Sequence, residues 1–463
     1  MDNLTRLIAN YAATLTFEDL PEEVVHAATQ RMVDSLACAI AAYRCEPAQI
    51  ALRLARRAVP EQYPGRILGF GEQSTAESAA FVNTAMIRNL DFNDQYPGGH
   101  PSDCLGAFLA IAESAGADGR RLLSSMVVAY EIFPRLNDVT GLRMKGWDQG
   151  FVIGICTAAG VGHLLRLSPE KLGEAIAITA VANVPMRNTR AGELSFWKGA
   201  ATAFATRNGM FATLLAAGGM TGPDRPFEGK HGLWDLITGP FEITPFGGRG
   251  GKFRTSEVQL KYWPVEYNAQ LVVWAALELR SKVNWRDLTD IDIGTYTFAY
   301  SEIGSDPEKW DPKTRETADH SLAYIFAKTL VEGTINADSF EEAAVRDPSL
   351  RPLMAKTRVR IDEEVDANYP AHVSMKVEAT TTDGKRYILE PRDPLGHNKK
   401  PMQDKDIRTK FLGVAEPVLG LARASRALER WWDLQHVSDI SGALALLNIK
   451  AGVRGKKNPL RKR

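Results

Sequence analysis

The sequence predicts a mainly α-helical fold, in which a large all-helical domain is interrupted by a smaller α+β domain that covers it as a lid. Three observations support this prediction. Apolar residues recur with helical spacing up to about residue 264, strand-like alternation is confined to residues 285–392, and helical patterning returns from Asp404. We therefore expect a helical domain from residues 1–264 and 400–463, and an α+β lid domain from residues 265–399.

The helical domain is expected to begin with an amphipathic helix. Leu4, Leu7, Ile8 and Tyr11 follow the i, i+3, i+4, i+7 spacing that places side chains on one helical face. A further helix start is predicted at Ser168, because serine is a favourable N-cap and a proline follows it. Other Ala-rich segments predicted to be helical are residues 76–89, 105–115, 120–133, 151–165 and 199–217.

The lid domain is expected to combine strands with helices. Asp383-Gly384 lies between two strand candidates and predicts a β-hairpin, because this dipeptide favours the tight turn that joins antiparallel strands. Further strands are predicted at residues 291–297 and 357–361, and helices at residues 266–280 and 315–332.

Charge and composition argue against several classes of protein. Lys plus Arg and Asp plus Glu number 56 each, whereas nucleic-acid-binding proteins carry a basic surplus, so we expect no nucleic-acid partner. No stretch approaches the ~18 apolar residues of a membrane span, and the first residues lack a secretory signal pattern. Four scattered cysteines without a C-x-x-C pair argue against zinc and iron–sulfur sites and favour a reducing cytoplasm. The basic run at residues 456–463 is interpreted as a solvated terminus.

The segment with the strongest chemical signal, residues 91–103, lies between two predicted helices. It contains acids, a histidine and a loop rich in Gly and Pro, and catalytic residues often occupy such loops on a rigid scaffold. Asp91 or Asp94, paired with His100, would set the tautomer of the imidazole and raise its basicity. The alternative is that both acids cap helices and that His100 is a turn residue. A metal site is less favoured, because one histidine with two acids is a weak ligand set.

This segment and four later motifs resemble the MmgE/PrpD family, also called the 2-methylcitrate dehydratase family. The motifs occur in order: DFND at 91–94 with GHPSDCLG at 99–106, GELSFWKG at 192–199, KYWPVEYNAQ at 261–270, RETADHSLAY at 315–324 and DPLGH at 393–397. The resemblance implies a helical domain with an α+β lid, a homodimer, a small tricarboxylate substrate, and no metal or other cofactor.

The activity that the resemblance implies is a hydro-lyase reaction in the methylcitrate cycle of propionate catabolism. It dehydrates 2-methylcitrate, or a close hydroxy-tricarboxylate such as citrate, to the corresponding cis-aconitate. Cis-aconitate decarboxylase and iminodisuccinate epimerase resemble the same family, so either activity is an alternative within it. A family member that binds carboxylates without turnover is an alternative of another class.

Dehydration needs a base for the carbon-bound proton, an acid for the departing hydroxide and cations for the carboxylates. His100, oriented by Asp91 or Asp94, is the first candidate for acid or base. Lys261, in the motif at the domain junction, is expected to hold a substrate carboxylate. Glu266, close to a predicted helix start, either takes part in catalysis or is a first-turn acid without such a role.

The lid is expected to supply donors to the same site. Tyr324 lies four residues after His320, so on one helix the two would face the same side; the alternative is a packed aromatic ring and a capped imidazole. Further candidate carboxylate-binding cations, each with a helix-surface alternative, are Arg190, Lys198 and Arg315.

Three features depart from the family pattern. Decarboxylase-type members carry a lysine upstream of the position of Gly199, in a motif that this chain replaces with GELSFWKG, and this difference counts against a decarboxylase. Many members carry a histidine in the region that matches residues 147–152, and dehydratases often carry one at the position of Asn268, whereas this chain has neither. We therefore expect fewer protonatable donors around the substrate than in those members.

Overall fold

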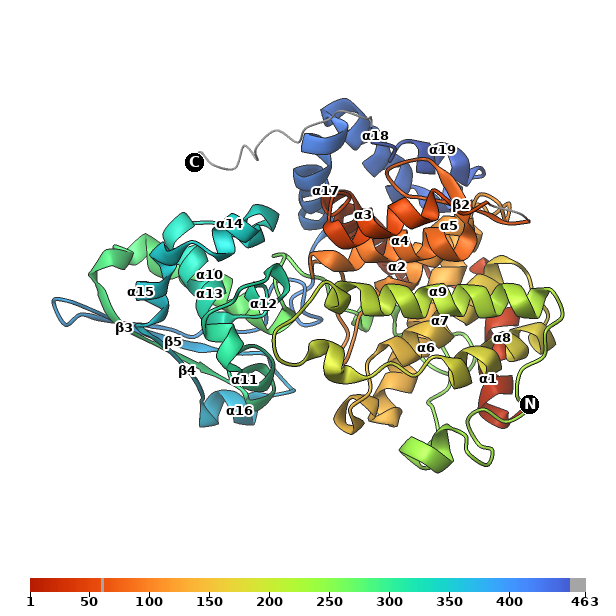
Figure 1. Ribbon diagram of the computed structural model, residues 1–463, viewed down its shortest axis with the longest axis horizontal. Coiled ribbons are helices and arrows are strands. Elements are labelled where there is room, and N and C mark those ends of the chain that lie inside the picture. Colours follow the sequence, from red (N-terminus) through yellow and green to blue (C-terminus); the bar gives the residue numbers. More distant parts are fainter. Residues whose placement is uncertain (60–61, 450–463) are drawn as a thin grey trace.

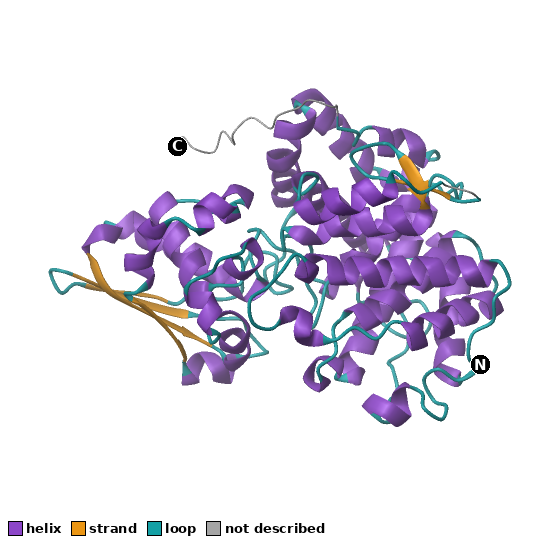
Figure 2. Cartoon of the chain, viewed as in Figure 1, coloured by secondary structure: helices purple, strands orange, loops and turns teal. Residues whose placement is uncertain are grey.

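The computed structural model describes residues 1–59 and 62–449 (Figures 1 and 2). The buried apolar side chains of these residues form two large hydrophobic cores. The larger core gathers buried side chains from residues 4–260 and 402–447, and the smaller one from residues 265–389. The predicted fold class is confirmed, because helices form the larger part and a four-stranded sheet with helices forms the smaller part. The basic C-terminal run lies outside the described residues. None of the helices described combines the length and apolar character that crossing a bilayer requires.

The helical domain is organised around α9 (Trp197–Ala217), which packs against α4 (Ala76–Asn89), α7 (Gly150–Leu164) and α8 (Pro169–Ala182) (Figure 1). Small residues permit this approach, since a Cβ at Gly209 would lie 2.5 Å from the carbonyl oxygen of Gly154. The chain returns from the lid through α17 (Asp404–Leu419), which packs against α2 (Glu22–Ala41). The remaining α-helices of this domain are α1 (Asn3–Thr14), α3 (Glu46–Ala55), α5 (Leu105–Ile111), α6 (Gly119–Thr140), α18 (Leu421–Trp432) and α19 (Ile440–Ala445).

The helix starts follow the local signals. The Ser168 hydroxyl accepts a hydrogen bond from the backbone N–H of Lys171 and caps α8, as predicted. On α1 the predicted apolar face is buried at Leu4, Ile8 and Tyr11, but Leu7 is exposed, so the face is narrower than the spacing indicates.

The helical domain also contains a short antiparallel pair, β1 (Pro64–Arg66) and β2 (Gln73–Thr75). The sequence prediction confines strands to residues 285–392, and the structure corrects it here. Strands of three residues are too short to show an alternating pattern, which explains why the periodicity missed them.

The lid contains a β-sheet (Figure 1), and its strand order is β4-β3-β5-β6. The central strand β3 (Leu288–Thr295) pairs in parallel with β4 (Thr357–Ile361) and antiparallel with β5 (Lys376–Thr381). β5 forms the predicted hairpin with β6 (Arg386–Leu389), and Gly384 supplies the positive φ of the turn, 80°. Side chains on β5 alternate between buried and partly exposed, so the sheet packs on one face, where α10 (Gln270–Lys282) and α13 (Leu322–Glu332) contact it. The other lid helices are α11 (Thr297–Ile303), α12 (Arg315–Ala318), α14 (Glu342–Val345), α15 (Arg351–Met354) and α16 (Glu363–Asn368).

The single helix predicted at residues 315–332 is broken into α12 and α13. Thr314 caps the start of α12, and the Ser321 hydroxyl accepts a hydrogen bond from the Tyr324 backbone N–H and caps α13. Because a second cap starts a second helix, His320 lies in the turn between the two. The prediction that His320 and Tyr324 share one helical face is therefore wrong.

Candidate active site

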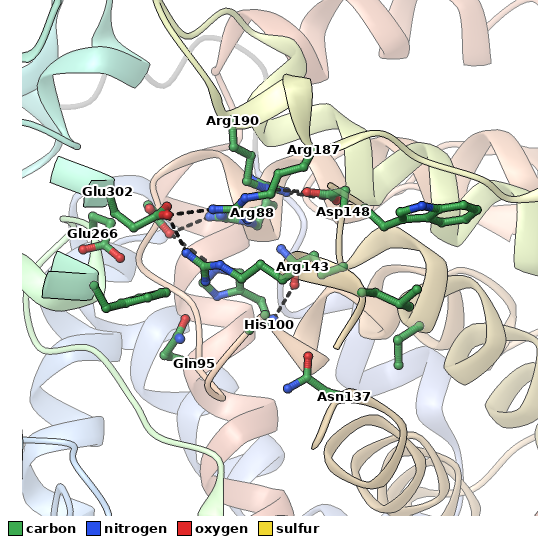
Figure 3. A pocket seen from close by; sticks show the side chains of 18 of the residues that line it. Arg88, Gln95, His100, Asn137, Arg143, Asp148, Arg187, Arg190, Glu266 and Glu302 are labelled. Carbon is green, nitrogen blue, oxygen red and sulfur yellow. Dashed lines mark hydrogen bonds and ion pairs between the residues drawn. The ribbon is translucent and has the colours of Figure 1, made fainter. Parts of the chain in front are cut away.

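A cavity lies at the junction of the two domains (Figure 3). Polar and charged side chains dominate its lining, and they come from both domains. The helical domain contributes Arg88, Asp91, His100, Arg143, Asp148, Gln149, Arg187, Arg190 and Lys261, and the lid contributes Glu266, Phe298, Glu302 and His320, among others. Cavities between domains are preferred places for small ligands, and arginines suit carboxylates because the guanidinium donates paired hydrogen bonds.

Asp91 is the centre of the charge network in this cavity. It follows α4 with a φ of 48°, a left-handed conformation that aspartate tolerates better than most residues. Its carboxylate lies 2.6 Å from Arg88 Nη1, 2.7 Å from Lys261 Nζ and 3.2 Å from Lys198 Nζ. Burial alone would raise the pKa of Asp91, but these three cations lower it well below its usual value. Asp91 is therefore ionised throughout the physiological pH range.

His100 presents an unprotonated ring nitrogen to the cavity. Its Nδ1 lies 2.5 Å from the backbone carbonyl oxygen of Asp94, and because a carbonyl only accepts hydrogen bonds, Nδ1 carries the proton. The lone pair of Nε2 is then free, 3.9 Å from Asp91 Oδ1. Burial, followed by the charges of Arg88 and Lys261, lowers the pKa of His100 well below its usual value. The imidazole is thus neutral near pH 7 and has a free lone pair, but burial and the nearby cations make it a weaker base, whereas the sequence suggested that an acid partner raises its basicity.

His320 approaches Asp91 from the lid. Its Nδ1 lies 2.5 Å from Asp319 Oδ1, and its Nε2 lies 3.5 Å from Asp91 Oδ2. Burial and the Lys198 ammonium lower the pKa of His320 to about 4, although both carboxylates oppose this. Asp91, Asp319 and His320 are close enough together to offer three ligands to a metal ion, but the Lys198 ammonium lies 3.2 Å and 3.4 Å from the two carboxylates. The Lys198 ammonium therefore already pairs with both carboxylates of this group.

The loop that carries His100 is held by Gln149, which precedes α7. The backbone N–H of His100 donates to Gln149 Oε1 at 2.6 Å. Gly99 makes this contact possible, since a Cβ at that position would overlap the same oxygen and the ring of Phe133. The side-chain amide of Gln149 therefore fixes the backbone of His100.

Two further ion-pair groups line the cavity (Figure 3). Arg190 donates to Asp148, with 2.6 Å between Nε and Oδ2. Arg143 and Arg187 both lie 2.7 Å from Glu302, which α11 contributes from the lid. The second group thus joins the two domains across the cavity.

Glu266 is a carboxyl group that can exchange a proton near neutral pH. Burial raises its pKa to about 7, with Asp91 raising it further and Lys261 opposing the shift. Its side chain accepts hydrogen bonds from the backbone N–H of Asn268 at 2.6 Å and from the Asn268 side chain at 2.8 Å. Asn268 therefore holds the Glu266 carboxyl group in place.

Most of the residues predicted from the sequence meet in or beside this cavity. His100, Asp91, Lys261, Arg190, Glu266 and His320 line it, and Lys198 lies behind Asp91. Asp94 does not line it: its carboxylate accepts hydrogen bonds from Ser102 and Tyr130, and burial raises its pKa to about 6. It reaches His100 through its backbone carbonyl, and not through the carboxylate that the sequence suggested.

The structure does not bring Tyr324 or Arg315 to the cavity. The Tyr324 hydroxyl donates to the carbonyl oxygen of Ser339 at 2.6 Å inside the lid core. Arg315 lies with its guanidinium carbon 5.5 Å from the centre of the Phe340 ring. Both residues lie within a family motif, but the start of α13 at Ser321 turns Tyr324 toward the lid interior.

Sequence reasoning missed several lining residues, namely Arg88, Arg143, Asp148, Gln149, Arg187 and Glu302, as well as Asp319 beside the cavity. Asp319 lies inside the motif at residues 315–324, and Asp148 and Gln149 lie within residues 147–152, which the sequence analysis had already singled out. These three residues could therefore have been predicted from the sequence. Arg143, Arg187 and Glu302 belong to no motif, and only the packing of the domains brings them together.

These features define a two-domain, mainly α-helical protein with an arginine-rich cavity at the domain junction. The chain belongs to the MmgE/PrpD family: residues 6–245 match the MmgE/PrpD N-terminal domain and residues 263–434 match the MmgE/PrpD C-terminal domain. The family resemblance found in the motifs is thus confirmed.

Curated relatives carry two kinds of name. The chain is 26% identical to a cis-aconitate decarboxylase-like protein of Aspergillus oryzae, aligned over 96% of this chain and 97% of the relative. It is 25% identical to the cis-aconitate decarboxylase of Aspergillus terreus, over 96% of each chain. It is 28% identical to the 2-methylcitrate dehydratase of Cupriavidus necator, over 72% of this chain and 74% of the relative. Dehydratases and decarboxylases are both lyases, so these relatives agree on the reaction class and differ in the bond that is broken.

Proposed function

We propose that this protein is a hydro-lyase that dehydrates 2-methylcitrate, or a close hydroxy-tricarboxylate such as citrate, to the corresponding cis-aconitate by acid–base catalysis without a metal. One observation carries the proposal: the free Nε2 of neutral His100 belongs to a cavity whose lining also holds Glu266, with a pKa of about 7, and five Arg and Lys side chains. A base, a proton-exchanging acid and carboxylate-binding cations are the groups that dehydration requires.

In the proposed reaction, His100 Nε2 takes a proton from the carbon next to a substrate carboxylate. The electron pair of that C–H bond forms the new double bond, and the hydroxyl group leaves as water after it receives a proton. Glu266 is the proposed acid, because a carboxyl group with a pKa of about 7 is partly protonated at neutral pH. His320, whose pKa of about 4 keeps it neutral near pH 7, is proposed to contact the substrate and not to act as the acid. Lys261 and Arg190 are proposed to hold substrate carboxylates and to stabilise the enolate-like charge that develops.

Decarboxylation of cis-aconitate is the second candidate reaction. The similarity to relatives named cis-aconitate decarboxylase extends over 96% of the chain, whereas the similarity to the Cupriavidus necator dehydratase covers 72%. Both reactions need a polycarboxylate site. Arginines that stabilise a carboxylate in the ground state oppose its loss as CO₂, so this lining favours dehydration. An epimerase of iminodisuccinate type and a non-catalytic carboxylate-binding protein are the further alternatives.

The test compares products from three substrates. Purified protein is incubated separately with 2-methylcitrate, citrate and cis-aconitate, while the ultraviolet absorbance of a conjugated product and the release of CO₂ are followed. We expect absorbance to rise with at least one hydroxy-tricarboxylate and no CO₂ to form. Release of CO₂ from cis-aconitate would overturn the dehydratase proposal in favour of a decarboxylase. Thermal stabilisation by these acids without any product would identify a binding protein instead.

We also propose that the protein is a cytoplasmic homodimer that acts in the methylcitrate cycle of propionate catabolism. This proposal follows from the resemblance of the sequence motifs to the family. Light scattering of the purified protein is expected to give twice the mass of one chain, and a mass of one chain at micromolar concentration would contradict the dimer.

A further inference from the structure

Arg143 and Arg187 share one carboxylate across the domain junction. Both arginines belong to short 3₁₀ helices of the helical domain, η3 (Leu142–Lys145) and η4 (Arg187–Arg190), and Glu302 belongs to the lid. Each guanidinium lies 2.7 Å from the same oxygen, Glu302 Oε1 (Figure 3). All three side chains line the cavity and keep between 22% and 25% of their surface exposed.

This group differs from the other ion pairs of the cavity in its exposure. Asp148, the partner of Arg190, is 1% exposed, and Asp91 is 2% exposed among its three cations, so those carboxylates keep almost no exposed surface. Arg143 and Arg187 are balanced by one carboxylate and carry a net positive charge. A guanidinium has five N–H donors, so the pair retains donors for another acceptor.

We propose that Arg143 and Arg187 form a subsite for one carboxylate of the substrate, and that Glu302 fills this subsite as an internal carboxylate that the substrate displaces. The inference rests on the proposed function in taking the substrate to be a polycarboxylate. The substrate group and the group that it displaces are chemically alike, since one carboxylate replaces another between the same two guanidinium groups. A tricarboxylate has a third carboxylate that can bind between Arg143 and Arg187. A dicarboxylate is held through both of its carboxylates by the other cations of the lining, so this subsite adds nothing to its binding.

Phe298 keeps the subsite in place during this exchange. Its ring centre lies 4.1 Å from the guanidinium carbon of Arg143, and it precedes Glu302 by four residues on α11. The cation–π contact does not depend on Glu302, so Arg143 stays in the cavity wall when the carboxylate leaves.

The test measures binding with two ligands that cannot be dehydrated, because neither carries a hydroxyl group. Propane-1,2,3-tricarboxylate and glutarate share a five-carbon chain and differ by the central carboxylate. Calorimetry gives the Kd of each ligand for the wild-type protein and for the variants Arg143→Met, Arg187→Met and Glu302→Gln. We expect the wild type to prefer the tricarboxylate, and each arginine variant to lower that preference about tenfold, the effect of one charged hydrogen-bonding group. Glu302→Gln is expected to bind the tricarboxylate more tightly, because it removes the competing charge.

Arg408→Met is the matched control. Arg408 pairs with a single glutamate, Glu429, at 2.5 Å and lies 4.4 Å from the ring centre of Trp432, so it reproduces the ion pair and the aromatic contact of Arg143 away from the cavity. We expect this variant to keep the wild-type Kd for both ligands. An unchanged preference in the Arg143 and Arg187 variants, or weaker tricarboxylate binding by Glu302→Gln, would overturn the subsite. The gain of affinity in Glu302→Gln cannot arise from a damaged fold.

The two proposals fail in different ways. If neither 2-methylcitrate nor citrate is dehydrated but the variants shift the ligand preference as expected, the hydro-lyase assignment is refuted and the subsite stands. If dehydration occurs but the preference does not change in the variants, the subsite is refuted and the hydro-lyase assignment stands.

Discussion

The ammonium of Lys410 lies 2.6 Å from the carboxylate of Asp34 inside the helical domain, and both side chains are almost fully buried. Lys410 belongs to α17 and Asp34 to α2. The same ammonium donates to the backbone carbonyl oxygens of Phe92 at 2.8 Å and Lys261 at 2.9 Å. One buried cation thus connects the helix that returns from the lid to the two backbone segments that carry Asp91 and Lys261.

We expect Lys410→Met to destabilise the protein by about 3–5 kcal/mol, because it leaves Asp34 as an unpaired buried acid and two carbonyl groups without their donor. Denaturant unfolding measures this change. Lys405→Met, an exposed lysine of the same helix, is the control and should change the unfolding free energy by less than about 0.5 kcal/mol. A loss below about 1 kcal/mol in Lys410→Met would show that the buried ion pair is not a main support of this region.

His100→Ala is expected to lower kcat by about 10²–10⁴-fold, the usual contribution of a positioned acid–base group. Substrate dissociation constants should change little, because the carboxylates are held by the surrounding cations. The measurement is steady-state turnover of whichever hydroxy-tricarboxylate proves active, with the unfolding midpoint as the control for folding. Turnover within threefold of the wild-type rate would remove His100 from the mechanism.

The sequence predicted Asp91, His100 and Lys261 as site residues, but it did not predict Arg143 and Glu302. Asp91, His100 and Lys261 lie in motifs whose residues are polar where a helical core would be apolar, so the amino-acid pattern alone distinguishes them. Arg143 and Glu302 come from segments with ordinary helical-surface composition. Their meeting depends on how the lid packs on the helical domain, and periodicity carries no information about that arrangement.

Local hydrogen bonding also limited what could be predicted. The sequence suggested that an acid orients His100, whereas a backbone carbonyl does so, and every residue has a carbonyl group. Likewise, the apolar spacing of residues 315–332 suits one helix, but Ser321 competes for the backbone N–H of Tyr324 and starts a new helix. The overall class of the fold was predictable because it depends on patterns summed over many residues.

Tyr324→Phe separates a catalytic role from a structural one. The hydroxyl group donates to a carbonyl oxygen inside the lid core, so its removal should cost about 1–2 kcal/mol of unfolding free energy. Because Tyr324 lies outside the cavity lining, we expect kcat and KM to stay within twofold of the wild-type values. A large fall in kcat at unchanged stability would instead support the sequence-based prediction that Tyr324 is catalytic.

Glu266→Gln tests the proposed acid through the pH dependence of turnover. Burial raises the pKa of Glu266 from 4.5 to about 7, so the carboxyl group is protonated below that pH and loses its proton above it. If this proton is delivered to the leaving hydroxide, kcat/KM of the wild type falls as the pH rises through about 7. The variant should have a lower kcat/KM and lack this descending limb.

The raised pKa of Glu266 also makes the unfolding free energy of the protein decrease as the pH rises. Between pH 4.5 and about 7 the folded state keeps the Glu266 proton while the unfolded state releases it, so folding binds protons and this contribution is lost as the pH rises. Glu266→Gln has no proton to release, so its unfolding free energy should fall less than that of the wild type between pH 5 and pH 8. Parallel stability curves for the two proteins, together with an unchanged pH profile of turnover, would show that Glu266 does not titrate in this range and is not the acid.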